Sequence, residues 1–456
     1  MGVRKGALVL AATAAGLLLA GPADAQTLRH ALSAAYSTNP TLNVARSTLR
    51  SIDENIAIAR SGNRPTVSAN LSQGLTTSRT IGTVNSGSRS GPTEVQIRIA
   101  QPLFNGFQVR NSIRAAEAAV KSERKALENT EQNVLLTSAQ AFYDVILNRE
   151  VVRLRQSDVA FLSRQTTAAR DRFDVGEGTR TDVSQAEARR AEAQSFLDEA
   201  IANLSTAEAT FRQQTGLTAG NLIDNIDEKR LLPPTLDAAI ALGQNRHPAI
   251  LAAMFAVDQQ LFNVSALEGQ FLPSLSLNGT AGTTFNSTSR VSQSDNATVS
   301  LDLTVPIYQG GRVSAEVRQA KENLGTQRIQ VDLTRDDVRQ FTVSSWANYQ
   351  GAVRSIQNSR TGVFAAQLAL QGTIEEQKVG QRTTLDVLDA QRDLISAQLT
   401  LVQSERDSSV AAFTLMSSIG SLSAERLGLQ VAYYRPAEHT DAVRDKWFGF
   451  RTPDGR

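Results

Sequence analysis

The chain has 456 residues, with 47 Lys and Arg against 45 Asp and Glu, so its formal net charge is only +2 at neutral pH. A charge this small argues against nucleic acid as a partner. The sequence contains no cysteine, which excludes disulfides, thiolate metal sites, a cysteine nucleophile and a lipidated N-terminal cysteine. Aromatic residues make up only 5% of the chain, a composition typical of long helices on narrow seams rather than of one large globular core.

The start of the chain has the pattern of a secretory signal peptide. A basic start and an apolar run at 7–20 precede Ala23-Asp24-Ala25, so we predict a signal peptide at 1–25. A membrane anchor is the rival interpretation, but this run of 14 residues is shorter than the roughly 18 that a spanning helix needs. No later segment holds a comparable uninterrupted apolar run, so we expect no membrane helix in the mature chain. An exported chain of this kind is periplasmic, secreted or an outer-membrane barrel.

The second half of the chain, 236–420, repeats the plan of the first half, 26–216. Matching motifs recur in the same order, first 208 and then 204 residues apart. They include Asn39-Pro40 and His247-Pro248, Pro102-Leu103-Phe104-Asn105-Gly106 and Pro306-Ile307-Tyr308-Gln309-Gly310, and Val175-Gly176-Glu177-Gly178-Thr179 and Val379-Gly380-Gln381-Arg382-Thr383. Their shared order indicates an internal duplication. Two segments lie outside the repeats, a linker at 217–235 and a C-terminal tail at 421–456. We expect both near the middle of the molecule's length.

Each half reads as helix, strand, loop, strand, long helix, turn and helix. In the first half, periodicity predicts helices at 28–61, 106–173 and 181–215. It also predicts strands at 66–78 and 93–104, which form a β-hairpin (66–104). In the second half, it predicts helices at 236–270, 310–377 and 385–419. The predicted strands at 274–285 and 297–308 form a second β-hairpin (274–308). Polar loops at 79–92 and 286–296 join the paired strands.

The predicted strands alternate apolar and polar residues. Val67, Ala69 and Leu71 alternate with Ser68 and Asn70, and the other three strands follow the same rule. An ordinary antiparallel sheet with one wet face would show this pattern. The signal peptide and the long polar tips favour the wall of an outer-membrane barrel instead. Because the smallest membrane barrels use about eight strands, four strands require the protein to oligomerise.

The predicted helix lengths describe an elongated wall. The helices at 106–173 and 310–377 would each be roughly 100 Å long at about 1.5 Å per residue. In each half the two shorter helices sum to the same length, so they can stack end to end beside the long one. We therefore expect the strands at one end of the wall and the helical turns at the other.

With these features the chain resembles outer membrane efflux proteins of the TolC family over nearly its whole mature length. The resemblance rests on the repeated Pro-(Leu/Ile)-(Phe/Tyr)-x-Gly junctions, the paired Val-Gly-x-x-Thr-x-x-Asp-Val turns and Thr384-Leu385-Asp386-Val387-Leu388-Asp389-Ala390-Gln391. It implies an α+β membrane protein, a homotrimer whose chains each give four strands to one twelve-stranded β-barrel in the Gram-negative outer membrane. An α-helical periplasmic barrel would continue from it, closed at its far end.

The resemblance also implies a function and partners. Such channels passively conduct drugs, toxins or secreted proteins, delivered by an inner-membrane transporter and a periplasmic adaptor. Nothing in the sequence identifies the cargo. A periplasmic coiled-coil adaptor or scaffold is the alternative, disfavoured by the amphipathic strands and the two matched halves. The three histidines are scattered and form no known catalytic motif, so we predict no enzyme activity, catalytic residue, metal or cofactor.

The residues expected to form the entrance lie in the two turns. From the residues alone, the acids near the start of the predicted helix at 385–419 are explained by the helix dipole, which favours acids at an N-terminus. The resemblance implies instead that Asp386 and Asp389 form a cation-favouring constriction ring, and that Arg382, Asp182 and Thr181 form links that keep the entrance closed. Gln377 stands where the family has a tyrosine in that network. The tip glycines are either ordinary turn formers or adaptor-docking positions: Gly176, Gly178 and Gly380.

Overall fold

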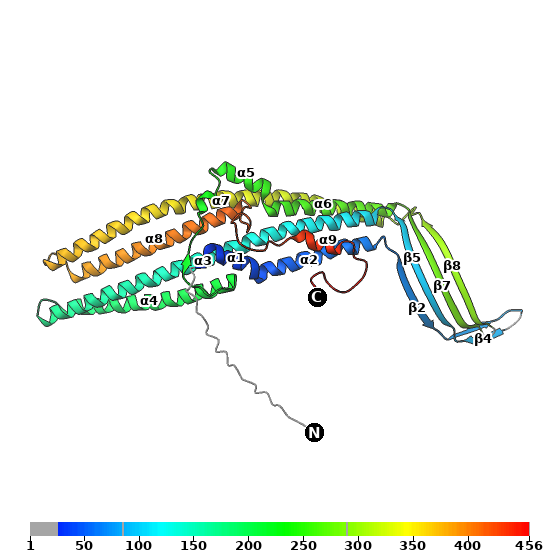
Figure 1. Ribbon diagram of the computed structural model, residues 1–456, viewed down its shortest axis with the longest axis horizontal. Helices are drawn as coiled ribbons and strands as arrows, with labels where there is room; N and C mark the ends of the chain where they lie inside the picture. The colour runs from blue at the N-terminus through cyan, green and yellow to red at the C-terminus, as the bar shows by residue number, and fades with distance from the viewer. Residues whose placement is uncertain (1–25, 84–85, 289–290, 456) are drawn as a thin grey trace, which may run out of the picture.

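The computed structural model describes residues 26–83, 86–288 and 291–455. The predicted signal peptide at 1–25 lies outside these residues. The molecule is long and narrow, with a β-sheet at one end, a helical wall along its length and two helical hairpins at the other end (Figure 1). The predicted α+β architecture is therefore confirmed for one chain.

The duplication is visible element by element. The first half contains β1 (Gln26–Thr27), α1 (Leu28–Thr38), α2 (Pro40–Ser61), β2 (Thr66–Gln73), β3 (Thr76–Thr80), β4 (Ser86–Ser90), β5 (Thr93–Asn105), α3 (Gln108–Asp174) and α4 (Arg180–Thr215). After β6 (Leu222–Ile223) and η1 (Glu228–Arg230), the second half contains α5 (Leu236–Arg246), α6 (Pro248–Glu268), η2 (Gly269–Phe271), β7 (Ser274–Thr288), β8 (Val291–Thr304), α7 (Arg312–Lys378) and α8 (Thr384–Ser418). The tail adds α9 (Pro436–Val443).

The structure corrects several predicted boundaries. The single helices predicted at 28–61 and 236–270 are each two helices, because a proline disfavours helical backbone at the residue before it. Asn39 and His247 sit at these breaks with extended ψ angles of 124° and 126°. The predicted loops are also shorter, since a β3–β4 hairpin occupies most of 79–92 and β7 and β8 run into 286–296.

The main sheet is antiparallel, in the order β2-β5-β7-β8. Its register places Val67 opposite Ile99 and Leu275 opposite Leu303, so the predicted apolar positions share one face. Ser68 lies opposite Arg98 on the other face. Within the described chain, β2 and β8 each have one neighbour in this sheet, which leaves both of its edges open.

The helices form a wall in which short helices stack end to end, as predicted. The long helices α3 and α7 have 67 residues each, which corresponds to about 100 Å. In the first half, the Asn39 side-chain amide donates to the Gln214 carbonyl oxygen at 3.0 Å, where α4 meets the α1–α2 break. In the second half, the end of α8 meets the α5–α6 break, where a Cβ atom added to Gly420 would lie 2.7 Å from the His247 Cα.

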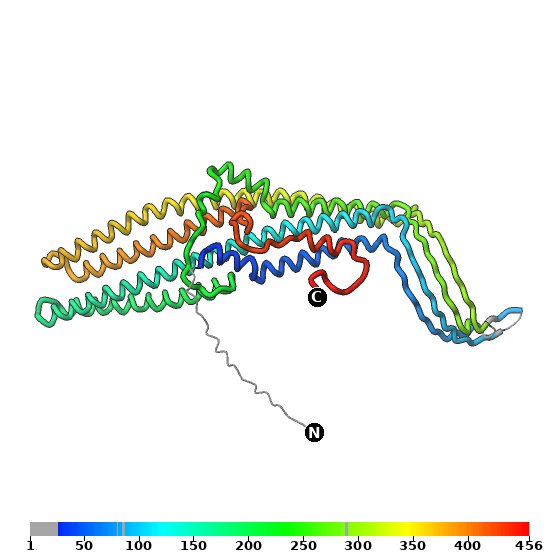
Figure 2. The backbone as a smooth tube through the Cα atoms, viewed as in Figure 1, coloured from blue at the N-terminus to red at the C-terminus, as the bar shows by residue number. Residues whose placement is uncertain are grey.

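The largest core lies at mid-length, where the linker and the start of the tail cross the wall (Figure 2). Phe142, Phe211 and Phe413 are fully buried there. The Tyr143 hydroxyl lies 2.8 Å from a carboxylate oxygen of both Asp224 and Glu228, which fixes the linker to α3. This core holds the two halves of the chain together.

One helical stretch differs from the expectation that the mature chain lacks a membrane-helix candidate. Leu236–Phe271 is long and apolar enough to cross a membrane by length and composition. Polar residues divide the stretch, so it contains no uninterrupted apolar run of spanning length. In the structure its second part, α6, packs between α3 and α7 in the helical wall. A wall helix with neighbours on two sides needs apolar residues around much of its surface.

The sheet register generates a first prediction. Ile97 is 50% exposed on the apolar face, and its neighbour Gln96 points to the opposite face. If lipid covers the apolar face, Ile97→Lys should lower the free energy of unfolding from lipid vesicles by about 2–4 kcal/mol. The matched control Gln96→Lys should change it little. Urea titration of both variants in vesicles measures the difference, and equal effects would contradict a lipid-covered face.

Candidate functional site at the helix tips

The two helical hairpins end in the same turn, which explains the repeated glycines. Gly176 and Gly380 have φ angles of +83° and +78°, in the left-handed region where other residues are strained. The Glu177 amide donates to the Arg172 carbonyl oxygen at 2.8 Å, and the second turn forms the equivalent bond. This pattern is the Schellman motif that ends many helices. Both glycines are therefore required by the fold of the turn.

The next residues of each turn start the returning helix with a capping box. Thr179 with Asp182, and Thr383 with Asp386, satisfy the first amides of α4 and α8. The Asp386 carboxylate accepts hydrogen bonds from the backbone amide and the hydroxyl of Thr383, both at 2.8 Å. The backbone amide is the main reason that the pKa of Asp386 is lowered. Helix capping thus explains why an acid stands at both positions.

Asp389 lies one turn further along α8 and has different partners. Its carboxylate is 3.2 Å from the Arg189 guanidinium on α4 and 3.6 Å from Arg392 on its own helix. The Arg189–Asp389 pair joins the two helical hairpins near their tips. Both side chains are between three and four tenths exposed, so the pair is worth on the order of 1 kcal/mol or less. No local sequence pattern marks Arg189 as the partner of Asp389.

The predicted closing links do not form within the chain. Arg382 pairs with Glu376 at 2.9 Å rather than with Asp182. Asp182 is occupied by the capping box with Thr179, and Thr181 is exposed. Contacts of these residues between copies of the chain stay a prediction.

Gln377, the departure from the family pattern, is buried and forms its own polar link. Its side-chain amide donates to the Thr384 hydroxyl at 3.3 Å. Its carbonyl oxygen accepts from the Arg172 guanidinium at 3.5 Å. Through these bonds Gln377 connects the end of α7 to both α8 and α3, so the position is not an empty place in the network.

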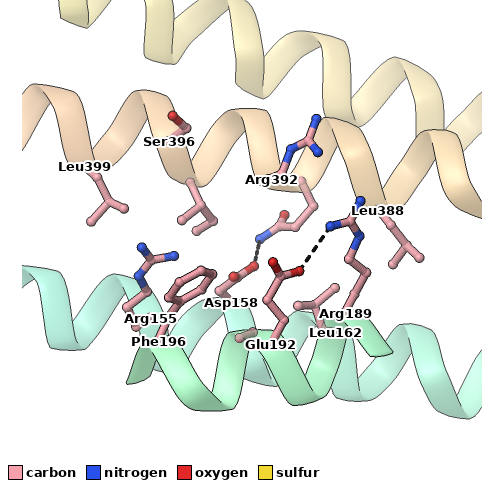
Figure 3. Close-up of a pocket in the computed structure, with 13 residues that line it drawn as sticks. Arg155, Asp158, Leu162, Arg189, Glu192, Phe196, Leu388, Arg392, Ser396 and Leu399 are labelled. Carbon is pink, nitrogen blue, oxygen red and sulfur yellow. Dashed lines mark hydrogen bonds and ion pairs between the residues drawn. The ribbon is translucent and has the colours of Figure 1, made fainter. Parts of the chain in front are cut away.

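A cavity of about 280 Å³ separates the hairpins beside the Arg189–Asp389 pair (Figure 3). Its lining combines apolar side chains with Arg155, Arg189 and Arg392. The Gln391 side-chain amide crosses it from α8 and donates to the Asp158 carboxylate on α3 at 2.8 Å. Burial raises the pKa of Asp158, while the Gln391 hydrogen bond and Arg155 oppose that rise. Asp158 lies four residues from both Leu154 and Leu162 and so shares their buried helix face. A carboxylate at this apolar spacing was the sequence signal that could have identified it.

The arrangement at the tips holds helices together and presents charged side chains. It combines two capped turns with polar links between the hairpins, namely the Arg189–Asp389 ion pair, the Arg172–Gln377 hydrogen bond and the buried Gln391–Asp158 bond. Among the described residues, no group of three or more His, Asp or Glu side chains is placed to bind a metal ion. The geometry is that of two helical hairpins joined by polar contacts near their tips.

Asp158 generates a prediction on pH. Its raised pKa means that the folded chain keeps this proton to a higher pH than the unfolded chain. The stabilising contribution is therefore complete below the ordinary carboxyl pKa and is lost as the pH rises through the raised value. Asp158→Asn should melt at a higher temperature than the wild type at neutral pH, and the gap should close in acid. Thermal melts at both pH values measure it, with the exposed Asp198→Asn as control, and a constant gap would contradict the assignment.

Comparison with known proteins identifies the family. The model of the family described as outer membrane efflux protein matches residues 31–217 and 240–421, one block for each half. Outer membrane efflux protein BepC of Brucella suis biovar 1 is 45% identical, covering 97% of this chain and 96% of that protein. Proteases secretion protein PrtF of Dickeya chrysanthemi is 26% identical over 92% of this chain and 94% of that protein. Among solved structures, the outer-membrane channel OprN has a TM-score of 0.76 at 19% identity, covering 88% of this chain and 91% of that one. The chain therefore belongs to the outer membrane efflux protein family.

Proposed function

We propose that this chain is one of three subunits of an outer-membrane exit duct for drugs or secreted proteins. The observation that carries the proposal is a four-stranded sheet with one apolar face and two open edges, continuous with a helical wall. Three copies would supply twelve strands, enough to close a membrane barrel. The polar face of the sheet would then line the channel. The relatives support both kinds of cargo, since one is named for efflux and another for protease secretion.

The wall gives the duct its reach and its docking end. At about 100 Å, the helices extend far from the membrane into the periplasm. We propose that a periplasmic adaptor and an inner-membrane transporter engage the hairpin tips. A Cβ atom added to Gly176 or Gly380 would meet nothing within 4 Å, so the backbone there is open to another protein. At Gly178 an added Cβ would press on Arg172 and Phe173, so this glycine serves the turn itself.

The entrance would close where the α8 helices of three copies meet. In that assembly Asp386 and Asp389 place six carboxylates around one constriction, which favours cations. Arg189 compensates part of this charge at Asp389 and ties α8 to α4 of the same chain. Arg382, Asp182 and Thr181 would add links between copies. A scaffold protein would not need the apolar sheet face.

Single-channel conductance in planar bilayers tests the proposal. Arg189→Ala should raise the unit conductance because it releases α8 from α4. It should also raise cation selectivity because it leaves the Asp389 charge less compensated. Asp389→Asn should lower cation selectivity. Arg190→Ala is the matched control, since it removes the same charge one residue along α4 at an exposed position.

Two results would contradict the proposal. Correctly assembled protein that conducts no ions would exclude the duct. Conducting protein in which Arg189→Ala and Asp389→Asn leave both conductance and selectivity unchanged would keep the duct but move the constriction elsewhere.

A further inference from the structure

The C-terminal tail leaves the middle of the molecule and is fastened to α2. Asp53 on α2 is fully buried, and its two carboxylate oxygens each lie 2.8 Å from a tail side chain, His439 Nδ1 and the Thr440 hydroxyl. The Arg124 guanidinium on α3 also donates to the Thr440 hydroxyl, at 2.6 Å. A buried polar cluster of this kind fixes α9 in one place. The tail is therefore packed against the helical wall, and from there it runs toward the sheet (Figure 1).

Beyond α9 the tail is held at the base of the sheet. Asp445 forms an ion pair with Arg60 in the last turn of α2. The Arg64 guanidinium donates to the Lys446 carbonyl oxygen at 2.7 Å and lies 4.6 Å from the ring centroid of Trp447. Arg64 stands two residues before the first residue of β2. The tail thus delivers its aromatic residues to the junction between helices and strands.

These aromatic residues are exposed in the chain. Trp447 is 65% exposed, Phe448 is 91% exposed and Phe450 is fully exposed. An exposed aromatic cluster on an ordered, fastened segment marks an interaction surface. The Arg64 guanidinium lies over the Trp447 ring, and the Lys446 ammonium donates to the Arg451 carbonyl oxygen within the same segment, so the surface combines aromatic rings with positive charge.

Along the long axis of the molecule, this cluster lies level with the helix-side edge of the apolar face of the sheet. Val67 and its partner Ile99 are the first apolar pair of β2 and β5. Val67 is three residues beyond Arg64, so at about 3.3 Å per residue its Cα lies within roughly 10 Å of the tail's attachment point. Other exposed aromatic residues flank the same ends of the strands: Phe107, Phe271 and Tyr308.

We propose that the tail segment 446–451 binds the periplasmic leaflet of the outer membrane. Its aromatic rings lie at the level of the lipid headgroups, where Trp and other aromatic residues form belts around membrane barrels. Arg64 and Lys446 face the lipid phosphates. Lipid is favoured over a second protein because the cluster continues the apolar band of the sheet and carries cations at its edge. The proposal rests on the membrane role of the sheet, and the experiment separates the two.

Tryptophan fluorescence tests this placement, because the chain has only two tryptophans, Trp346 and Trp447. The variant Trp346→Phe makes Trp447 the sole reporter. It is reconstituted as the full assembly in phosphatidylethanolamine–phosphatidylglycerol vesicles that contain lipids brominated near the headgroup or near the chain end. Bromine near the headgroup should quench most of the Trp447 emission, and bromine near the chain end should quench clearly less. The converse variant Trp447→Phe retains Trp346 in the wall and should be quenched by neither.

A third variant makes the outcomes distinct. Leu71→Trp, with both native tryptophans replaced by phenylalanine, reports on the apolar face of the sheet at a position that is 74% exposed. If this reporter is quenched and Trp447 is not, the tail proposal is overturned while the barrel stands. Unquenched, blue-shifted Trp447 emission would assign the cluster to a neighbouring copy. If neither reporter is quenched, the membrane role of the sheet fails, and the tail proposal with it.

Discussion

The backbone amide and carbonyl groups along the two open edges of the main sheet need hydrogen-bond partners, and the rest of this structure depends on that constraint. In hydrocarbon no water can satisfy the free amides and carbonyls of an edge strand, so a membrane sheet must close on itself. The described chain provides four strands, with β2 and β8 at open edges. Closure therefore requires other copies, and the helical wall that continues from the strands must assemble with them. One chain is a segment of a tube rather than a complete domain.

The duplication supplies the geometry of that segment. Each half contributes two strands to the main sheet, one long helix and three shorter helices stacked end to end, and the core at mid-length joins the halves. The same turn chemistry, a Schellman motif followed by a capping box, ends both hairpins. The halves differ in what the returning helices carry, since α4 presents Arg189 and α8 presents Asp389. Because the two repeats carry opposite charges at these positions, one repeat can form an ion pair with the other within the same chain.

The sequence predicted the features that depend on local periodicity and missed those that depend on packing. Alternation identified the apolar sheet face, and helix spacing identified the wall. The breaks at Asn39 and His247 were predictable, because proline follows each of them. The Arg189–Asp389 pair joins residues 200 positions apart, so it follows only from how the hairpins pack. The path of the tail likewise depends on Asp53 being buried within α2, a residue that no local pattern marks.

Disulfide trapping of the sheet edges tests the central claim most directly, because the natural chain has no cysteine. One cysteine is placed on β2 at Ser68, and a second is moved along β8 at Ser300, Asp302 and Thr304 in separate variants. Closure between copies predicts that at least one pair, oxidised in the outer membrane, gives covalent dimers and trimers but no larger species. Absence of linked chains at every position, or an open ladder beyond trimers, would contradict a closed ring of three copies.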